Sequence, residues 1–582
     1  MASIGLARPA ALRRLVLRAT PEGVLLAAVA AIVAYLVLSP IAFLFIASLR
    51  RYELIGSIAF VFTLANYRDA YLTPDFLEAF VNSFVYAVGG TAVALAIGTA
   101  LAWIVERTNA PLRGLIVLGA AATYLIPGVL ITLAWVLLAN ARIGSLNHLI
   151  RLVVPIDDPM GPLDIGTMGG MIWVFASHLY PVAFLIMSAA FRSMDPSLEE
   201  AAALSGAGIA GTLRRVTLGV SRPALISAGL LLLVRGLESF EVPLIIGIPA
   251  KIRVMTTEIY SNAALVQPPE PGMSAALGVL LLALSIVGVF FYQRATGRAR
   301  AFATITGKAY RARRLDVGRT RFALTGLVIA FFVLTFALPI AAIAWVSLFK
   351  FVIQPSVEAL PRAGLSQYQF VLTYPAIVDS FRNSVLNSVV VATIVVALAS
   401  LAAWIVLRTR VPARGLLDGL AFAPIAIPGT IIGLSVLLTY LTLPIPLYGT
   451  VFLITIAHVT MFLPYGMRLA SDALLRVHPE LEEAAALSGA SWAVSYRRIL
   501  LPLLVPGLIA AWITVVAVSF RELSATIFLA TPQSRFVSVV MYSTWSDGNT
   551  TAAAAIGMVI LVVVLALAIG AWIVGRRFRI AE

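Results

Sequence analysis

The sequence predicts an all-α protein that crosses a membrane about twelve times, as two parallel repeats of six helices. Of its 582 residues, 61% are hydrophobic and 12% are charged, whereas a soluble domain carries roughly 25% charged residues. Apolar stretches of about 20 residues, long enough to cross a ~30 Å hydrocarbon core, recur along the chain. Motifs of the first half return in the second. Composition therefore indicates a polytopic membrane protein, and the repeats indicate a duplicated one.

Twelve apolar stretches are the candidate spanning helices. Those of the first half fall at 24–49, 79–105, 114–139, 170–190, 223–247 and 274–293, and those of the second half at 322–348, 384–407, 416–441, 450–470, 506–531 and 551–575. Basic residues precede the first stretch, as in a secretory signal peptide, but the stretch is too long for such a signal. We therefore expect it to remain as the first span.

The positive charges of the loops predict the orientation. Arg and Lys gather on one face, in segments 1–23, 106–113, 191–222, 294–321, 408–414 and 576–582. Cytoplasmic loops retain such residues, so this face and both termini are predicted to be cytoplasmic. Arg50 and Arg51 are exceptions. Membrane topology thus explains the net charge of +15, and the nine Arg or Lys against one Asp in 294–321, better than nucleic-acid binding does.

These boundaries divide the chain into five parts. We predict a cytoplasmic N-terminal segment at 1–23, a first repeat at 24–295, a basic cytoplasmic linker at 296–321, a second repeat at 322–575 and a cytoplasmic tail at 576–582. The chain has no cysteine, which excludes disulfides, thiol catalysis and cysteine-bound metal.

The two halves align at two offsets. "FVNS" at 80–83 matches "FRNS" at 381–384, and "LIPG" at 125–128 matches "AIPG" at 426–429, both 301 residues apart. "WIVERTNAPLRG" matches "WIVLRTRVPARG" at the same offset. Further along, the offset falls to 283, because the first half has 18 extra residues in an exterior loop. Since each half has an even number of spans, the halves share one orientation, and a pathway is expected between them.

The phrase "LEEAAALSGA" occurs at 198–207 and again at 481–490. Each copy lies in the cytoplasmic loop between the fourth and fifth spans of its half, and these loops are expected to occupy 195–222 and 478–505. Asp195 can cap a short helix, and carboxylates are favoured near its positive end. A glycine with positive φ can then end the helix and turn the chain. The residues of this pattern are Glu199, Glu200, Ala201, Ala202 and Gly206 in the first loop and Glu482, Glu483, Ala484, Ala485 and Gly489 in the second.

A single loop of this kind could be an ordinary connecting helix. Two near-identical copies, each in the same loop of its half, indicate two equivalent docking contacts instead. A partner with two similar subunits would supply them.

The loops resemble the signature of ABC importer permeases. In that signature a glycine stands six residues after the Glu of Glu-Ala-Ala, and the motif Ile-x-Leu-Pro begins ten residues after that glycine. The second copy matches in full at Glu483, Ala484, Ala485, Gly489, Ile499, Leu501 and Pro502, whereas the first matches at Glu200, Ala201, Ala202, Gly206 and Leu218 and departs at Val216 and Gly219. The resemblance implies a type I ABC importer permease in a bacterial inner membrane. It also implies that two copies of an ABC ATPase subunit seat these loops as coupling helices, and that a periplasmic or lipid-anchored binding protein delivers the substrate.

The sequence lacks a nucleotide-binding loop of the form G-x-x-x-x-G-K-[ST]. In its nearest match, "TITGKAY", Phe302 replaces the first glycine and Ala309 replaces the hydroxyl residue. ATP and Mg²⁺ are therefore expected on a separate subunit. We expect this chain to have no catalytic residue and no cofactor of its own.

Five charged residues lie inside predicted spans five and eleven. A charge costs ~2.5–3.5 kcal/mol at the bilayer centre and so usually faces a cavity or pairs internally. Arg235, Glu238 and Glu241 recur every three residues in span five and are expected on one helical face. In span eleven, Arg521 aligns with Glu238, and Glu522 adjoins it. Two interpretations stay open: these residues form interior ion pairs, or they line the translocation pathway.

Several segments resemble permeases of ferric-iron importers, notably "ESFEVPLIIG", "PLYGT", "FLPYGMRLAS" and "SFRELSATIFLATP". The resemblance implies ferric iron as the cargo, and the acidity of span five suits a hard cation that prefers oxygen ligands. His178 and His458 are interpreted as packing residues, so no metal site is predicted. Related permeases serve thiamine, polyamines or phosphonates. The alternatives from other classes are an ion-coupled secondary transporter, which can share the repeat architecture, and a sensor or scaffold without transport.

Overall fold

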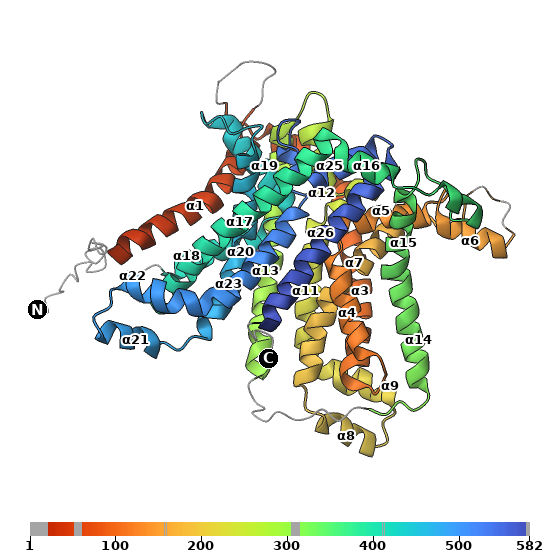
Figure 1. The fold of residues 1–582 in the computed structure, drawn as a ribbon, viewed down its shortest axis with the longest axis horizontal. Coiled ribbons are helices and arrows are strands. Elements are labelled where there is room, and N and C mark those ends of the chain that lie inside the picture. The colour runs from red at the N-terminus through yellow and green to blue at the C-terminus, as the bar shows by residue number, and fades with distance from the viewer. Residues whose placement is uncertain are drawn as a thin grey trace, which may run out of the picture.

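The computed structural model describes residues 21–51, 61–155, 158, 160–303, 315–409, 411 and 414–577. Long helices dominate, and most of them lie side by side along the height of the molecule (Figure 1). In these ranges the only extended pairings are two isolated β-bridges, so the all-α prediction is confirmed there. Most of the predicted N-terminal segment, the middle of the basic linker and the end of the tail lie outside the described residues.

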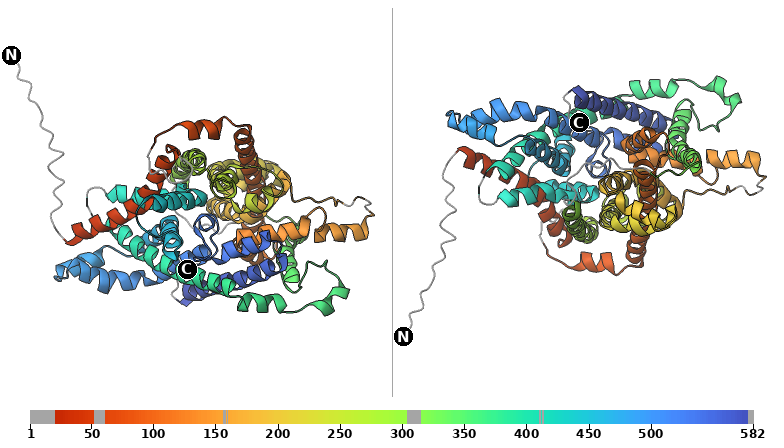
Figure 2. Two further views of the ribbon diagram at one scale, coloured as in Figure 1. Left: turned by 90° about the horizontal axis from the view of Figure 1, so that it is seen from above. Right: turned by 90° about the horizontal axis from the view of Figure 1, so that it is seen from below.

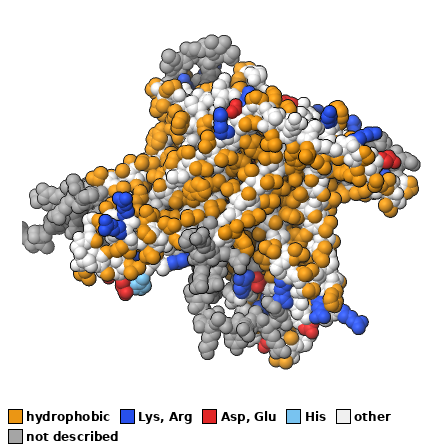
Figure 3. Space-filling view, viewed as in Figure 1, with side chains coloured by type: hydrophobic (Ala, Val, Ile, Leu, Met, Phe, Trp, Pro, Cys, Tyr) orange, Lys and Arg blue, Asp and Glu red, His pale blue; other side chains and the backbone are white. Residues whose placement is uncertain are grey.

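Nine helices within the described ranges are long and apolar enough to cross a membrane, and the number rises to twelve if three bent helix pairs each count as one span. The long helices are α1 (Pro21–Ser48), α3 (Pro74–Arg107), α7 (Met168–Ser193), α13 (Pro271–Ala303), α14 (Thr320–Phe332) continuing into α15 (Leu338–Ser347), α17 (Pro375–Arg408), α20 (Val451–Leu475), α23 (Leu501–Phe520) and α26 (Thr550–Arg577). Apolar side chains cover the middle of the molecule, and charged side chains gather mostly toward its ends (Figure 3).

The predicted spans at 114–139 and 416–441 are not straight helices. In the first half α4 (Arg113–Leu125) meets α5 (Gly128–Ala139) at 99°, and in the second half the helix over 414–426 meets α19 (Gly429–Thr442) at 108°. Each bend falls at the proline of "LIPG" or "AIPG". A proline has no N–H to donate and forces the residue before it out of helical geometry. Accordingly, Ile126 and Ile427 are extended.

Spans five and eleven also break, which corrects their predicted bounds of 223–247 and 506–531. α11 (Arg222–Glu238) ends at Glu238, and a short π-helix η3 (Pro243–Gly247) and helix α12 (Met255–Tyr260) follow. α23 ends at Phe520 and is followed by α24 (Thr526–Leu529) and α25 (Val537–Ser546). The prediction that Arg235, Glu238 and Glu241 share one helical face is therefore wrong, because Glu241 lies beyond the break.

Matching hydrogen bonds in the two halves show that equivalent segments of the backbone are arranged in the same way. The side chain of Asn82 donates to the carbonyl of Arg253 at 3.1 Å, and that of Asn383 donates to the carbonyl of Arg535 at 3.1 Å. One residue further along, Ser83 accepts from a backbone N–H at 2.8 Å, and its counterpart in the second half does so at 2.9 Å. Each contact ties the start of the second span to the segment after the broken fifth span.

The first span of each half packs against the other half. α1 buries Val29, Val33 and Val37 among α17, α18 (Arg414–Phe422) and α20 of the second half. In return, Phe331 of α14 meets Tyr180 of the first half edge-on, with ring centroids 5.1 Å apart. Figure 2 shows α1, in red, beside the blue-green helices of the second half. Each half is therefore completed by a helix that belongs to the other.

The largest buried cluster draws on both halves and includes the segments that follow the helix breaks. At its centre Tyr260 packs against Phe240 of its own half, at 5.6 Å, and against Phe528 of the other half, at 5.4 Å. These segments lie toward the end of the molecule that carries α12, α19 and α25 (Figure 1). The two halves are thus packed against each other toward that end.

Candidate coupling and translocation sites

The two repeated loops form matching short helices at the end of the molecule opposite α12 and α25 (Figure 1). They are α8 (Ser197–Leu204) and α21 (Glu480–Leu487). At the start of α8, Asp195 accepts the backbone N–H of Ser197 at 2.9 Å, and this bond holds the pKa of the carboxyl below its usual range. Each helix ends before a glycine with φ of +81°, Gly206 or Gly489, so the predicted glycine bend is present in both loops.

The tip of each loop is an exposed leucine. Leu204 is 90% exposed and Leu487, at the equivalent position, is 91% exposed. The alanines before them are small, and a Cβ added at either bend glycine would meet no atom within 4 Å. Both loops therefore present the same apolar tip on an open, smooth surface.

The adjacent glutamates of each loop face in opposite directions. Glu200 and Glu483 are exposed, whereas Glu199 is 2% exposed. Arg107, at the end of α3, donates to Glu199 through Nη2 and through Nε, the latter at 3.1 Å. Thr217 adds a hydrogen bond to the other carboxylate oxygen at 2.5 Å. Glu199 was predicted as a coupling residue, and in the structure its carboxylate makes its contacts within the chain rather than on the exposed face of α8.

The second loop repeats this arrangement. Arg408 Nε lies 3.0 Å from Glu482 Oε1, and the indole N–H of Trp404 donates to Oε2 at 3.1 Å. The sequence analysis missed both arginines. Their signal was available in the aligned "WIVERT" and "WIVLRT" segments, where Arg107 and Arg408 occupy the same position 301 residues apart.

Arg235 both forms an ion pair and lines a cavity between the two halves. It pairs with Glu238 at 3.1 Å and also donates to the hydroxyl of Tyr465, in the other half, at 3.4 Å. It lines a cavity of about 490 Å³ whose wall comes from both halves and includes Tyr292, Gln293, Phe422, Tyr465 and Arg468. The cavity lies between α11 and α13 on one side and α20 on the other.

Arg521 crosses to the other half, where its hydrogen bonds go to backbone carbonyls. Its Nη1 donates to the carbonyls of Tyr124, Leu125 and Ile126, at 3.0–3.2 Å. These carbonyls end α4, where the helix dipole is negative and a cation is favoured. Arg521 therefore caps the end of a broken helix in the other half.

Glu241 approaches the start of α5, on the far side of the same bend. A Cβ at Gly128 would lie 1.7 Å from a carboxylate oxygen of Glu241. In the second half, a Cβ at Gly429 would lie 2.1 Å from the hydroxyl of Ser524, which is the residue equivalent to Glu241. The glycines of "LIPG" and "AIPG" therefore allow the segment after the broken fifth span to press against the bent third span.

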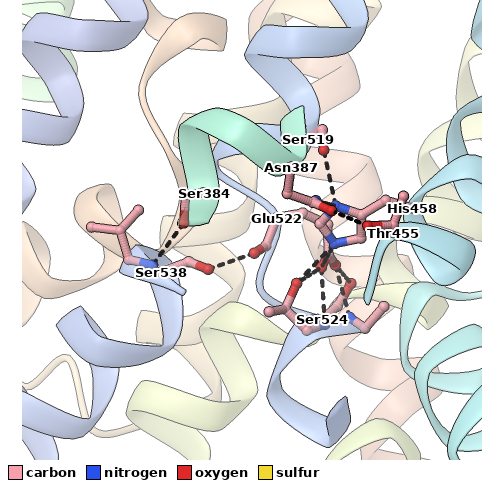
Figure 4. Close-up of polar contacts among 11 residues, drawn as sticks. Ser384, Asn387, Thr455, His458, Ser519, Glu522, Ser524 and Ser538 are labelled. Carbon is pink, nitrogen blue, oxygen red and sulfur yellow. Dashed lines mark hydrogen bonds and ion pairs between the residues drawn. The ribbon is translucent and has the colours of Figure 1, made fainter. Parts of the chain in front are cut away.

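Glu522 belongs to a buried polar cluster in the second half (Figure 4). It accepts the backbone N–H groups of Ala525 and Thr526, at 2.8 and 3.0 Å, and so holds the start of α24. His458 Nε2 lies 3.3 Å from the same carboxylate, and its Nδ1 meets Asn387 and Ser519. These contacts give His458 a packing role. Across the described residues, no three His, Cys, Asp or Glu side chains converge as metal ligands would.

The same position in the first half is aromatic. Tyr86 and Phe175, which align with Asn387 and His458, pack edge-on at 5.4 Å, and the Tyr86 hydroxyl bonds to Ser239 at 2.9 Å. The two halves therefore share a backbone but differ chemically around the break.

A duplicated bundle of membrane-spanning helices, with a cavity between its halves and paired loops at one end, defines a membrane permease. The chain belongs to the family of binding-protein-dependent transport system inner membrane components, which matches residues 94–301 and 395–579. The two matched segments correspond to the two repeats.

Curated relatives fall in the same class. The chain is 29% identical over 404 residues to the ferric transport system permease protein FbpB of Actinobacillus pleuropneumoniae, covering 68% of this chain and 57% of that protein. It is 24% identical over 386 residues to the Fe(3+)-transport system permease protein FbpB 2 of Haemophilus influenzae, covering 66% and 72%. The sulfate transport system permease protein CysT of Salmonella typhimurium matches 36% of the chain at 30% identity, over 81% of its own length. The chain thus spans little more than half the length of the first of these relatives.

Proposed function

We propose that this chain is the permease subunit of an ATP-driven ABC importer, and that α8 and α21 are its two coupling helices. The observation that carries the proposal is the pair of bent loops with the same glycine conformation and the same exposed leucine, at one end of the bundle. Leu204 and Leu487 would fill grooves on two ABC ATPase subunits, which bind ATP and Mg²⁺. The exposed Glu200 and Glu483 would supply the charge of each contact.

The orientation follows from the charges near these loops. Arg214 and Arg215 follow the first loop and Arg497 and Arg498 follow the second. Cytoplasmic segments retain such residues, so the end with α8 and α21 is the cytoplasmic one. α26 runs toward this end, which supports cytoplasmic termini. A binding protein would dock at the opposite end, where the halves are packed together, and the cavity beside Arg235 would be the part of the pathway open toward the cytoplasm.

Ferric iron is the cargo we propose. Two relatives named for ferric iron cover about two thirds of this chain, whereas the relative named for sulfate covers about one third. Carboxylate oxygens of Glu238 and Glu241 near the breaks would suit a hard cation. Thiamine, polyamines and phosphonates remain the alternative cargoes, and the binding protein would set most of the choice.

Reconstitution into proteoliposomes with the ATPase and the binding protein tests the proposal. Uptake of radioactive ferric iron is expected to stop when the ATPase carries a hydrolysis-dead substitution and to continue in the presence of an uncoupler. The reverse pattern would identify an ion-coupled secondary transporter. No flux of any cargo would identify a sensor or scaffold, and flux of sulfate or phosphonate alone would replace iron as the cargo.

A further inference from the structure

The arginine that pairs with each coupling loop also contacts the end of the fourth span of its half. Arg107 Nη1 donates to the carbonyl of Phe191 at 3.5 Å, and Arg408 Nη2 donates to the carbonyl of Leu474 at 3.1 Å. Phe191 and Leu474 are equivalent residues, 283 positions apart, in the last turns of α7 and α20. Arg408 also donates to the carbonyl of Val477.

A guanidinium is suited to such a junction because its rigid fork carries five N–H donors. One edge can meet the carboxylate of the coupling loop, while another meets the carbonyls that end a helix, where a positive charge is favoured. In both halves, the arginine is the last residue of the second span. One side chain therefore joins three elements: the second span, the fourth span and the coupling helix.

The cost of burying these charges shows that stability alone does not explain them. The side chains of Arg107 and Glu199 are 1% and 3% exposed, and well-packed apolar residues often stabilise a protein as much as a buried ion pair does. A junction that fixes geometry is a better reason to retain the charges at both sites.

The two halves reach the same junction with different supporting groups. Thr217 donates to Glu199, but the equivalent residue in the second half is Leu500, which has no hydroxyl. There Trp404 donates instead, whereas the indole N–H of the equivalent Trp103 has no hydrogen-bond partner among the described residues. The arginine and glutamate are shared, and only the second donor differs.

The second and fourth spans that meet at the junction are already closely packed. A Cβ at Gly98 of α3 would lie 2.7 Å from backbone atoms of α7, and a Cβ at Gly466 of α20 would lie 2.5 Å from Val395 of α17. A displacement delivered to the junction would therefore be shared by a helix pair rather than absorbed by one helix.

We propose that Arg107 and Arg408 are positioning residues, each of which joins a coupling helix to the second and fourth spans of its half so that they move as one body. The proposal rests on the proposed function, in which α8 and α21 receive movement from ATPase subunits. It predicts that cutting the junction separates ATP hydrolysis from transport while the ATPase stays attached.

The test removes both charges of one junction together, as R107A/E199A, because a single substitution would leave an unpaired buried charge. In the reconstituted complex we expect ATPase attachment and hydrolysis to stay within about twofold of the parent and cargo uptake per ATP to fall about tenfold, a typical size for coupling between sites. Glu106→Gln is the matched control. It breaks a neighbouring pair with Arg192, which is 72% exposed, and should leave uptake per ATP unchanged.

A second readout separates positioning from folding. Because the chain has no cysteine, spin labels can be placed at Ser193→Cys and Ser205→Cys, two exposed positions at the end of α7 and just after α8. The distance distribution between them should be narrow in the parent and broader in R107A/E199A. Should that variant fail to insert, Arg107→Lys, which keeps the charge without the fork, is expected to lower uptake per ATP about threefold.

Parental uptake per ATP in the variant that inserts would overturn the proposal, as would an unchanged distance distribution. Loss of ATPase attachment in R107A/E199A would also overturn it, since the pair would then belong to the docking contact. Failure of the proposed function has a different signature. In that case the parent complex itself would show no dependence of uptake on ATP hydrolysis.

Discussion

Leu204 and Leu487 give the most direct test of ATPase docking. Both side chains are about nine-tenths exposed in the free chain, so truncating them removes no internal packing. If each is buried in a groove of the partner, its transfer from water supplies ~1.5–3 kcal/mol of binding free energy. Leu→Ala keeps one side-chain carbon and should cost about 2 kcal/mol, or about 30-fold in Kd for one contact.

Each loop would seat its own ATPase subunit, so L204A/L487A should weaken each contact about 30-fold, and should weaken attachment of an ATPase dimer that bridges both loops by about 10³-fold. The assay is equilibrium binding of the purified ATPase to detergent-solubilised permease, with the Tm of the permease measured in parallel. Tm should not change, because the leucines make little contact within the chain. Leu72→Ala is the matched control, since Leu72 is 78% exposed directly after the short helix α2 (Ala65–Tyr71), outside the coupling loops. ATPase affinity in L204A/L487A equal to that of the control would refute the docking role.

Three further predictions concern the loops and the helix packing. Gly489→Val should strain the backbone of the second loop by ~1–3 kcal/mol, because Gly489 has φ of +81°. The variant should insert normally but lose uptake and bind the ATPase more weakly, and normal coupled transport would contradict this. Gly98→Ala should lower Tm, since overpacking costs ~1–3 kcal/mol, whereas Gly114→Ala, with no atom within 4 Å of its Cβ, should not. The depressed pKa of Asp195 means that its hydrogen bond to Ser197, at the start of α8, stabilises the fold above the ordinary Asp pKa and is lost as pH falls through the depressed value. A spin label at Ser205→Cys should therefore gain mobility in acid, and Asp195→Asn should remove that pH dependence.

The features that sequence could predict are those encoded locally. Apolar stretches and repeated phrases depend on neighbouring residues, so the approximate places of the apolar helices, the duplication and the glycine bends agree with the structure, whereas the bounds of spans five and eleven do not. The bends at Pro127 and Pro428 have an equally local cause, and the proline within each apolar stretch was a signal that could have been used. Hydropathy alone cannot find such a bend, because both arms of the helix are apolar.

Other features depend on residues far apart in the chain. Glu199 and Glu200 are adjacent and chemically identical, and only Arg107, 92 residues earlier, decides which of them faces inward. The partners of Arg521 are backbone carbonyls nearly 400 residues away, which no side-chain pattern reveals. Arg235 was predicted either to pair or to line the pathway, and its position at the meeting of the two halves allows both.

The exchange of α1 and α14 between the halves has a consequence for how such a molecule can be assembled. One half on its own would expose the apolar surface that the first span of the other half covers. In the second half this is the surface against which α1 buries Val29, Val33 and Val37. Two separately synthesised halves would therefore still associate through α1 and α14, even if the chain were cut in the basic segment between them. The peptide connection then serves chiefly to guarantee one copy of each half, and a symmetric pair of unfused six-span chains is a natural precursor of this architecture.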